Sequence, residues 1–300
     1  MHTLTTEQVA FFKKNGYLHV PAFFNQEEVA TFRAGCRNNK AGDSVCRPEF
    51  NRVMLSPKVI AVVKDLIGND VIYPGLSLTR TKDFPKSFGS RFFHTDVVDD
   101  DMDYTHPYPI INTGIYLQDH IHYSNALKVI PGSHTRPCVT SKTISGAVKN
   151  IVLAIIKGNV RDAWRILNLH RSVNLPSQAG DLLIWYVRTH HSGYGVRPKF
   201  FTNWSLPPVL ENWIPRFLRL PDNPDRDVML SIYAAPSKYL EPYLLKQIKK
   251  GYRHEHYIGN SCLESSEVQE LARSQGVTIR NDGYVYAKTH APEKITAEYS

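Results

Sequence analysis

Short strands that follow one another constrain this 300-residue chain more than any other feature. Runs of β-branched and aromatic residues, separated by Gly, Pro and Asn, occur at residues 71–80, 90–95, 110–118, 126–130, 181–188, 200–206 and 228–234. A parallel sheet needs a crossover, usually a helix, between successive strands, and most of these runs have none between them. We therefore predict an antiparallel sandwich or jelly roll and exclude a parallel doubly wound sheet.

Helices are expected mainly before these strands. Thr5-Thr6-Glu7-Gln8 has the form of a capping box, and Gly16 is placed to end the helix that the box begins. Further helices are expected at about residues 25–36 and 57–67.

Two inserts interrupt or follow the strands. One is a helical stretch within a basic segment at about residues 142–171, and the other is a C-terminal extension at about residues 239–300. The composition, 42% hydrophobic, allows a large core, and we expect one domain over residues 1–300.

The charge favours anionic partners, since 36 Lys and Arg face 28 Asp and Glu, a net charge of +8. In the first insert, apolar residues alternate with cations, and the cations are Lys142, Lys149, Lys157, Arg161, Arg165 and Arg171. Such a segment suits either a helix that covers the sheets or one that lies on an anionic membrane surface. No aromatic and basic RNA-binding motif accompanies it, so no nucleic acid is expected.

The cellular location follows from what the sequence lacks. The N-terminal residues do not resemble a secretory signal, and the four cysteines form no C-x-x-C pair. We expect a cytoplasmic protein, with the basic insert permitting peripheral contact with the inner face of a membrane.

Metal chemistry is suggested by Phe93-His94-Thr95-Asp96. In an extended strand, residues two apart point to one face, so His94 and Asp96 can offer a nitrogen and a carboxylate oxygen to the same ion. A histidine from a distant strand would complete a facial triad of the kind that holds Fe(II). Alone, the H-x-D triplet also fits a turn or a core histidine.

Two further stretches surround this triplet in the sequence. Residues 125–134 read Asn-Ala-Leu-Lys-Val-Ile-Pro-Gly-Ser-His, and residues 180–191 read Gly-Asp-Leu-Leu-Ile-Trp-Tyr-Val-Arg-Thr-His-His, with Arg197-Pro198 beyond. Together with the N-terminal helix and the H-x-D, they resemble the phytanoyl-CoA dioxygenase family of iron and 2-oxoglutarate-dependent oxygenases, in family order over residues 5–205. The resemblance implies a double-stranded β-helix, mainly β with flanking helices.

The resemblance places the distal metal ligand six residues after Trp185 and three after Arg188, at His191. Alternation along one strand through residues 185–191 would also put His191, and not His190, on the face of Trp185. His134, in the Pro-Gly-Ser-His turn, is the rival ligand, but the resemblance makes it structural. The expected metal set, which is also the catalytic set, is His94, Asp96 and His191.

The co-substrate contacts come from the same resemblance. Arg197 is expected to pair the distal carboxylate of 2-oxoglutarate through its planar fork, although the family usually has a longer gap after the histidine. Ser192, Thr79 and Thr113 are the other expected contacts with this co-substrate. Because a carboxylate, Asp96, fills the position that is small in halogenating relatives, hydroxylation or a related oxidation is expected.

The predicted function is thus an Fe(II)- and 2-oxoglutarate-dependent dioxygenase that uses dioxygen to hydroxylate or otherwise oxidise a C–H bond. The basic segments favour an anionic substrate such as the 3-deoxy-manno-octulosonate sugar of lipopolysaccharide. The alternatives are an acyl-CoA or a small secondary metabolite, and, outside the enzymes, a non-catalytic jelly-roll binding module.

Overall fold

The structure is a computed structural model of the chain. It describes residues 3–37, 48–80, 93–97, 104, 106–136, 144–160, 163, 172–201, 214–223, 227–249 and 259–290. The acidic run Asp99, Asp100, Asp101 and Asp103, part of the predicted strand at 90–95 and most of that at 200–206 lie outside these residues.

The N-terminal predictions are confirmed. Helix α1 (Thr6–Asn15) starts at the capping box, where the Thr5 side chain accepts from the Gln8 backbone N–H, and it ends at Gly16 in the left-handed conformation. After strand β1 (Tyr17–Val20) come α2 (Gln26–Arg37), the unpredicted α3 (Pro48–Met54) and α4 (Pro57–Ile67). Ser56 caps α4 and Pro57 occupies its first turn, which is a typical helix start.

Seven strands form the larger sheet. Its hydrogen-bonded order is β1-β7-β4-β9-β2-β10, with β3 also pairing β9. The strands after β1 are β2 (Val71–Tyr73), β3 (Ser77–Arg80), β4 (Ile110–Tyr116), β7 (Leu182–Tyr186), β9 (Val228–Ala234) and β10 (Val277–Ile279). All pairs are antiparallel except β10 with β2, which is parallel and which the sequence did not predict.

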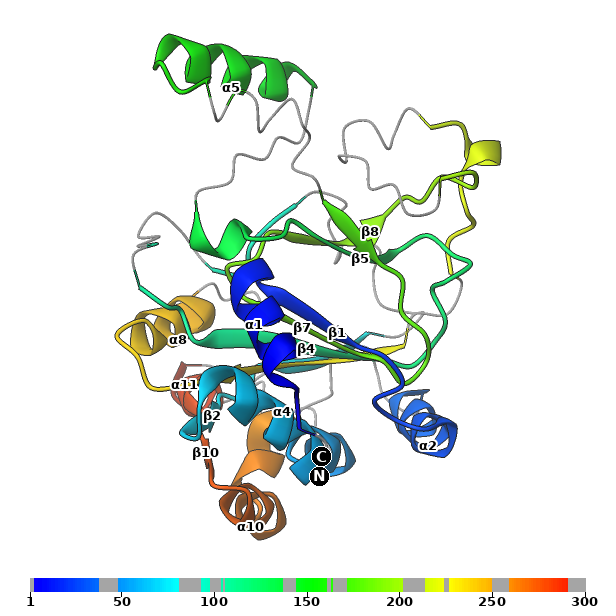
Figure 1. The fold of residues 1–300 in the computed structure, drawn as a ribbon. Coiled ribbons are helices and arrows are strands. Elements are labelled where there is room, and N and C mark those ends of the chain that lie inside the picture. The colour runs from blue at the N-terminus through cyan, green and yellow to red at the C-terminus, as the bar shows by residue number, and fades with distance from the viewer. Residues whose placement is uncertain are drawn as a thin grey trace.

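Three strands form the smaller sheet, in the order β6-β5-β8. They are β5 (Ala126–Val129), β6 (Val173–Leu175) and β8 (His191–Gly195), and both pairs are antiparallel. In Figure 1 this sheet lies above the larger one, while α4 lies below it. Two facing antiparallel sheets are the architecture expected of the double-stranded β-helix.

The inserts add the remaining helices. The first insert contains α5 (Ile144–Ile156), which Figure 1 shows apart from both sheets. Residues 161–171 of this insert, except 163, lie outside the described part of the chain. The C-terminal extension contains α8 (Leu240–Lys249), α10 (Ser266–Ser274) and α11 (Asp282–His290). No helix among the described residues is both long and apolar enough to cross a bilayer. The grouping of residues 1–300 into one domain stays a prediction.

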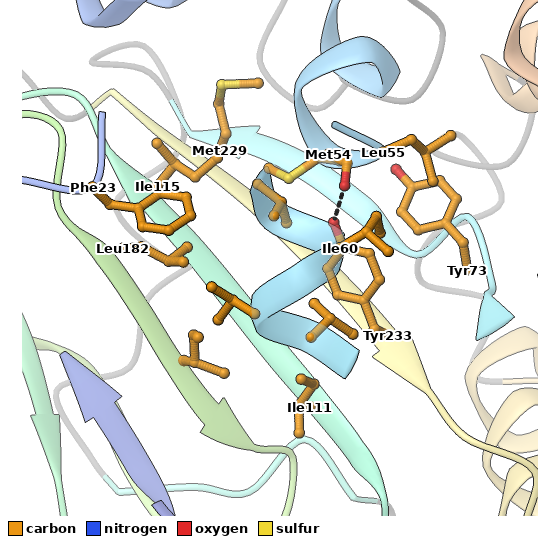
Figure 2. Packing of buried hydrophobic residues seen from close by; sticks show 14 of the residues in the cluster. Phe23, Met54, Leu55, Ile60, Tyr73, Ile111, Ile115, Leu182, Met229 and Tyr233 are labelled. Carbon is orange, nitrogen blue, oxygen red and sulfur yellow. Dashed lines mark hydrogen bonds between the residues drawn. The ribbon is translucent and has the colours of Figure 1, made fainter. Parts of the chain in front are cut away.

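The main hydrophobic core lies between the larger sheet and α4. Figure 2 shows Ile60 of α4 packed over Ile111 and Ile115 of β4 and Leu182 of β7. Tyr233 adds a buried hydrogen bond, because its hydroxyl donates to the Met54 carbonyl over 2.7 Å. The opposite face of the larger sheet meets the smaller sheet, where Leu183 and Trp185 join a second cluster with Leu127 and Val129 of β5.

Candidate metal centre

Backbone hydrogen bonds bring the predicted ligands together from distant parts of the chain. His94 and His191 face each other as an antiparallel bridge, in which each backbone N–H donates to the other's carbonyl, over 3.0 and 2.9 Å. The Asp96 N–H donates to the Val187 carbonyl over 2.9 Å. The short segment 93–97 is thereby fixed against the start of β8.

The three side chains converge at this bridge. Nε2 of His191 lies 3.4 Å from Oδ2 of Asp96, and Nε2 of His94 lies 3.9 Å from Oδ1 of the same carboxylate. One ligand atom from each residue lies within 4.8 Å of the others, and among the described residues no other His, Cys, Asp and Glu group of this kind was found. The His191 side chain is 7% exposed, whereas those of His94 and Asp96 are 40% and 30% exposed.

The proton on His191 is placed by its backbone neighbour. Nδ1 lies 2.9 Å from the Thr189 carbonyl, which can only accept, so Nδ1 is the donor. In the neutral ring Nε2 then carries a lone pair, and it faces a carboxylate oxygen that also only accepts. A cation between these two acceptors would satisfy both, so the donor set fits a metal ion.

Asn112, which was not among the predicted site residues, supports Asp96. Its amide Nδ2 donates to Oδ2 of Asp96 over 2.6 Å, and the Asp96 backbone carbonyl accepts from Nε2 of Gln247 over 2.9 Å. Asn112 stands opposite Trp185 in the β4–β7 register, which puts both on the face toward the smaller sheet. Such partners hold a ligating carboxylate in a fixed orientation.

Trp185 forms a wall of this site. Its ring centroid lies 5.4 Å from that of His191, and its buried indole Nε1–H has no hydrogen-bond partner within the described part of the chain. An unsatisfied buried donor is costly unless a bound group accepts from it. This wall therefore fits an anionic or carbonyl-bearing molecule beside the metal.

His191 reaches the site by a different route from the predicted one. Strand β7 ends at Tyr186, and a turn closed by the Thr189 N–H and the Tyr186 carbonyl carries the chain to β8 in the other sheet. The prediction of one continuous strand through residue 191 was therefore wrong, although the spacing counted from Trp185 identified the histidine that the structure brings to His94 and Asp96.

The two rival histidines lie elsewhere. His134 stacks on Tyr186 at 4.9 Å, and its Nε2 donates to the Lys13 carbonyl over 3.0 Å. Burial lowers the pKa of His134 below its usual value, and the charge of Arg188 lowers it further against the opposing effect of that hydrogen bond. His190 is buried behind the site, where its backbone N–H donates to the Ser133 hydroxyl.

Arg197 is buried, as a cation for a carboxylate would be, with 2% of its surface exposed. Its Nη1 donates to the carbonyls of His120, Ile121 and Tyr123 over 2.8, 2.7 and 3.0 Å. Burial lowers the pKa of Arg197, and nearby Asp119 opposes this shift. The guanidinium therefore supports the turn at residues 120–123, whatever else it binds.

The structure describes the surroundings of two of the three predicted hydroxyl contacts, Thr113 and Ser192. Thr113 is fully buried on the face of β4 opposite Asn112, and its hydroxyl donates to the Ser231 carbonyl over 3.3 Å. Ser192 follows His191 directly and pairs with Lys128, whereas His191 pairs with Val129, so alternation turns it to the other face of β8. Thr79 pairs with Met229 in β3, and its side chain lies outside the described part.

Solved structures share this fold. The non-heme alpha-ketoglutarate-dependent epimerase SnoN from nogalamycin biosynthesis is 17% identical with a TM-score of 0.50, over 76% of this chain and 80% of its own. The carbocyclase SnoK from the same biosynthesis is 19% identical with a TM-score of 0.50, over 77% and 84%. Apo HygX from Streptomyces hygroscopicus is 16% identical with a TM-score of 0.51, over 78% and 87%.

At these identities the likeness concerns the fold, and it confirms the predicted jelly-roll class. A search of the curated proteins found no match. The family model described as phytanoyl-CoA dioxygenase matches residues 39–200, more than half of the chain, and the matched region contains His94, Asp96 and His191. The chain therefore belongs to the phytanoyl-CoA dioxygenase family, the iron and 2-oxoglutarate-dependent oxygenases that its motifs resemble.

Proposed function

We propose that the protein oxidises a C–H bond of an organic substrate with dioxygen and 2-oxoglutarate, and that His94, Asp96 and His191 hold the iron. The observation that carries this proposal is the pair of facing acceptors, Nε2 of His191 and Oδ2 of Asp96, 3.4 Å apart. A bound Fe(II) would supply the oxidation of 2-oxoglutarate to succinate and carbon dioxide and the activation of dioxygen.

The protein's own groups position the reactants. Thr189 keeps the proton on Nδ1 of His191, so Nε2 stays available to the metal, and Asn112 holds Asp96 through its amide. Trp185 shields His191 from water and offers a buried N–H donor. Three protein ligands on one side leave the opposite side of an ion for the co-substrate and dioxygen.

The test is anaerobic titration with Fe(II) and 2-oxoglutarate, followed by turnover in air. We expect a weak visible metal-to-ligand band and succinate release from the wild type, and neither from His94→Ala, Asp96→Ala or His191→Ala. His190→Ala, the matched control beside the ligand, should keep most of the activity. Absence of the band from the folded wild type would instead favour the non-catalytic binding module.

Arg197 is our proposed partner for the distal carboxylate of 2-oxoglutarate. It is the buried cation that follows β8, and a guanidinium can bind a carboxylate through two parallel hydrogen bonds. Arg197→Lys should raise the KM for 2-oxoglutarate by about 10- to 100-fold. Because Nη1 also supports the turn at 120–123, thermal unfolding must be measured alongside. An unchanged KM would move this role to another residue.

Two substrate classes follow from different observations. The sequence favours an anionic glycolipid sugar such as 3-deoxy-manno-octulosonate, and α5 supports a lipid-bound substrate because Val152, Ile155 and Ile156 are 48%, 56% and 73% exposed. A small secondary metabolite is the second candidate, favoured by the fold shared with SnoN and SnoK from nogalamycin biosynthesis. An acyl-CoA remains the third class that the motifs allow.

Liposome flotation separates these classes. If α5 lies on an anionic membrane, acidic liposomes should retain the wild type at low salt and release it as the salt concentration rises. The Debye length, over which charges interact, falls from about 30 Å at 0.01 M to about 8 Å at 0.15 M. The double variant Lys149→Glu and Lys157→Glu should not bind. Arg216→Glu with Arg273→Glu, an equal charge change on other exposed residues, should still bind. Equal recovery of all three proteins would favour the small metabolite.

A further inference from the structure

A cavity of about 780 Å³ is lined by residues that include none of the three proposed metal ligands. Its walls come from the ends of α1 and α4, from residues 104, 106–109 and 134–135, and from the end of β7 with the turn that follows it. Three tyrosines (Tyr104, Tyr108 and Tyr186) and three cations (Lys13, Lys64 and Arg188) are among its lining residues. The volume is within the range typical of small-molecule sites.

Arg188 is the unusual residue of this cavity. Only 1% of its surface is exposed, yet its Nε and Nη2 atoms have no hydrogen-bond partner among the residues that the structure describes. The guanidinium carbon lies 4.1 Å from the ring centroid of Tyr108, 5.1 Å from that of Tyr239 and 5.4 Å from that of Tyr104. Stacking on aromatic faces offsets part of the cost of burying the charge, but it leaves the two N–H donors unsatisfied.

Arg188 lies apart from Arg197, the proposed co-substrate contact. Arg188 follows Val187, whose carbonyl accepts from Asp96, so the cavity begins one residue from the metal centre. Its wall residue Tyr186 packs with the helix-side core, whereas Trp185, the preceding residue, faces His191. The cavity thus opens on the other side of β7 from the metal ligands.

The other charges in the cavity leave a positive balance. Asp65 is its acidic lining residue, and that carboxylate already accepts from the Leu4 backbone N–H over 2.7 Å. Lys64 donates to the Gln275 carbonyl over 2.7 Å, which keeps its charge but satisfies one donor. An anion that enters would meet Arg188 as the buried cation with donors to spare.

We propose that this cavity binds a carboxylate carried on a flat, apolar or aromatic body, with the carboxylate on Nε and Nη2 of Arg188 and the flat body against Tyr104 and Tyr108. Two neighbouring N–H groups of one guanidinium match the two oxygens of a carboxylate. Tyrosine faces favour a planar group. The site is independent of iron and of turnover, so it stands or falls separately from the proposed oxidation.

Benzoate is a suitable probe, and benzamide, which has the same shape without the charge, is its control. Both are titrated calorimetrically into the full-length protein loaded with Ni(II) and saturated with 2-oxoglutarate. We expect benzoate to bind and benzamide to bind at least about tenfold more weakly. Arg188→Met should lose benzoate binding, and Arg188→Lys should weaken it by at least about tenfold, because lysine keeps the charge but not the fork.

Several outcomes would overturn this proposal. Equal binding of benzoate and benzamide to the wild type would show that the carboxylate charge does not contribute to binding. This comparison needs no variant. Benzoate binding that vanishes when 2-oxoglutarate is added would assign the carboxylate at Arg188 to the co-substrate. Binding that appears only when Asp99, Asp100, Asp101 and Asp103 are all changed to Asn would mean that the chain's own acidic run occupies Arg188.

Discussion

The two faces of the seven-stranded sheet are built from the same strands but hold different side chains. On the face toward α4, Ile111 and Ile115 of β4 join a closely packed apolar core. On the face toward the smaller sheet, Asn112 of the same strand donates a hydrogen bond to Asp96, a candidate metal ligand. Neighbouring residues in one strand therefore have unrelated tasks, and a substitution should affect stability or metal binding according to the face it occupies.

The largest effect should come from the core face. Ile60 is 1% exposed and packs between α4 and the sheet, so Ile60→Ala should lower the free energy of unfolding by about 2–5 kcal/mol. Urea unfolding measures this loss. Calorimetric Ni(II) binding to the folded variant should stay close to wild type, and a parallel loss of metal affinity would break the division between the two faces.

The opposite result is expected for Asn112→Leu. The substitution keeps the number and branching of the side-chain heavy atoms but removes the amide that donates to Asp96 over 2.6 Å, so Ni(II) affinity should fall by about 10- to 100-fold. Urea unfolding of the metal-free variant is the control and should change much less than for Ile60→Ala. A metal affinity equal to wild type would mean that Asp96 needs no support from β4.

Asp181 directly precedes β7, at the point where β1 pairs with that strand. Burial alone would raise its pKa, but hydrogen bonds from His19, Gln178 and Ala22 outweigh burial and lower the pKa below its ordinary 3.8. A lowered folded-state pKa contributes stability above about pH 4, and this contribution is lost as the pH falls further.

The variant Asp181→Asn should therefore be less stable at neutral pH and lose less stability than wild type on acidification below pH 4. Thermal unfolding between pH 7 and pH 3 compares the two proteins. Parallel curves for the two proteins would show that this carboxylate does not anchor β1.

The smallest effect is expected at Thr113, where the sequence predicted a co-substrate contact. Its hydroxyl donates to the Ser231 carbonyl on the core side, so Thr113→Val should cost about 0.5–1.5 kcal/mol of stability. The KM for 2-oxoglutarate should not change. A raised KM would indicate that Thr113 contacts 2-oxoglutarate, and that the core face of β4 also contributes to co-substrate binding.

Local rules predicted α1 and α4 well, because capping residues and Gly16 act over a few positions. They could not tell the faces of β4 apart. All seven residues of this strand are buried, so no alternation of polar and apolar residues marks the inner face, and Asn112 and Thr113 look equivalent. The parallel pairing of β10 with β2 was also beyond reach, since it joins segments about 200 residues apart.

His191 illustrates the limit at the site itself. The spacing that resembles a known family selected the histidine that the structure places beside His94 and Asp96, but the strand alternation used to support it assumed one strand where the structure has two, in different sheets. A turn of four residues cannot be read from hydrophobic pattern when its members, Val187 to His190, are all buried. Family spacing still led to His191 because a count along the sequence does not depend on the conformation of the residues between Trp185 and the histidine.

The hydrogen bond from Gln247 to the Asp96 carbonyl has a consequence for how the protein is made. The two residues are 151 positions apart, and His94 must also wait for His191 before its bridge can close. The ribosome synthesises the chain from its N-terminus. His94 and Asp96 therefore emerge long before His191 and Gln247, which hold them in place. Iron offered during synthesis would therefore meet an incomplete site, and metal loading becomes a step that follows the synthesis of Gln247 and its packing on the strands.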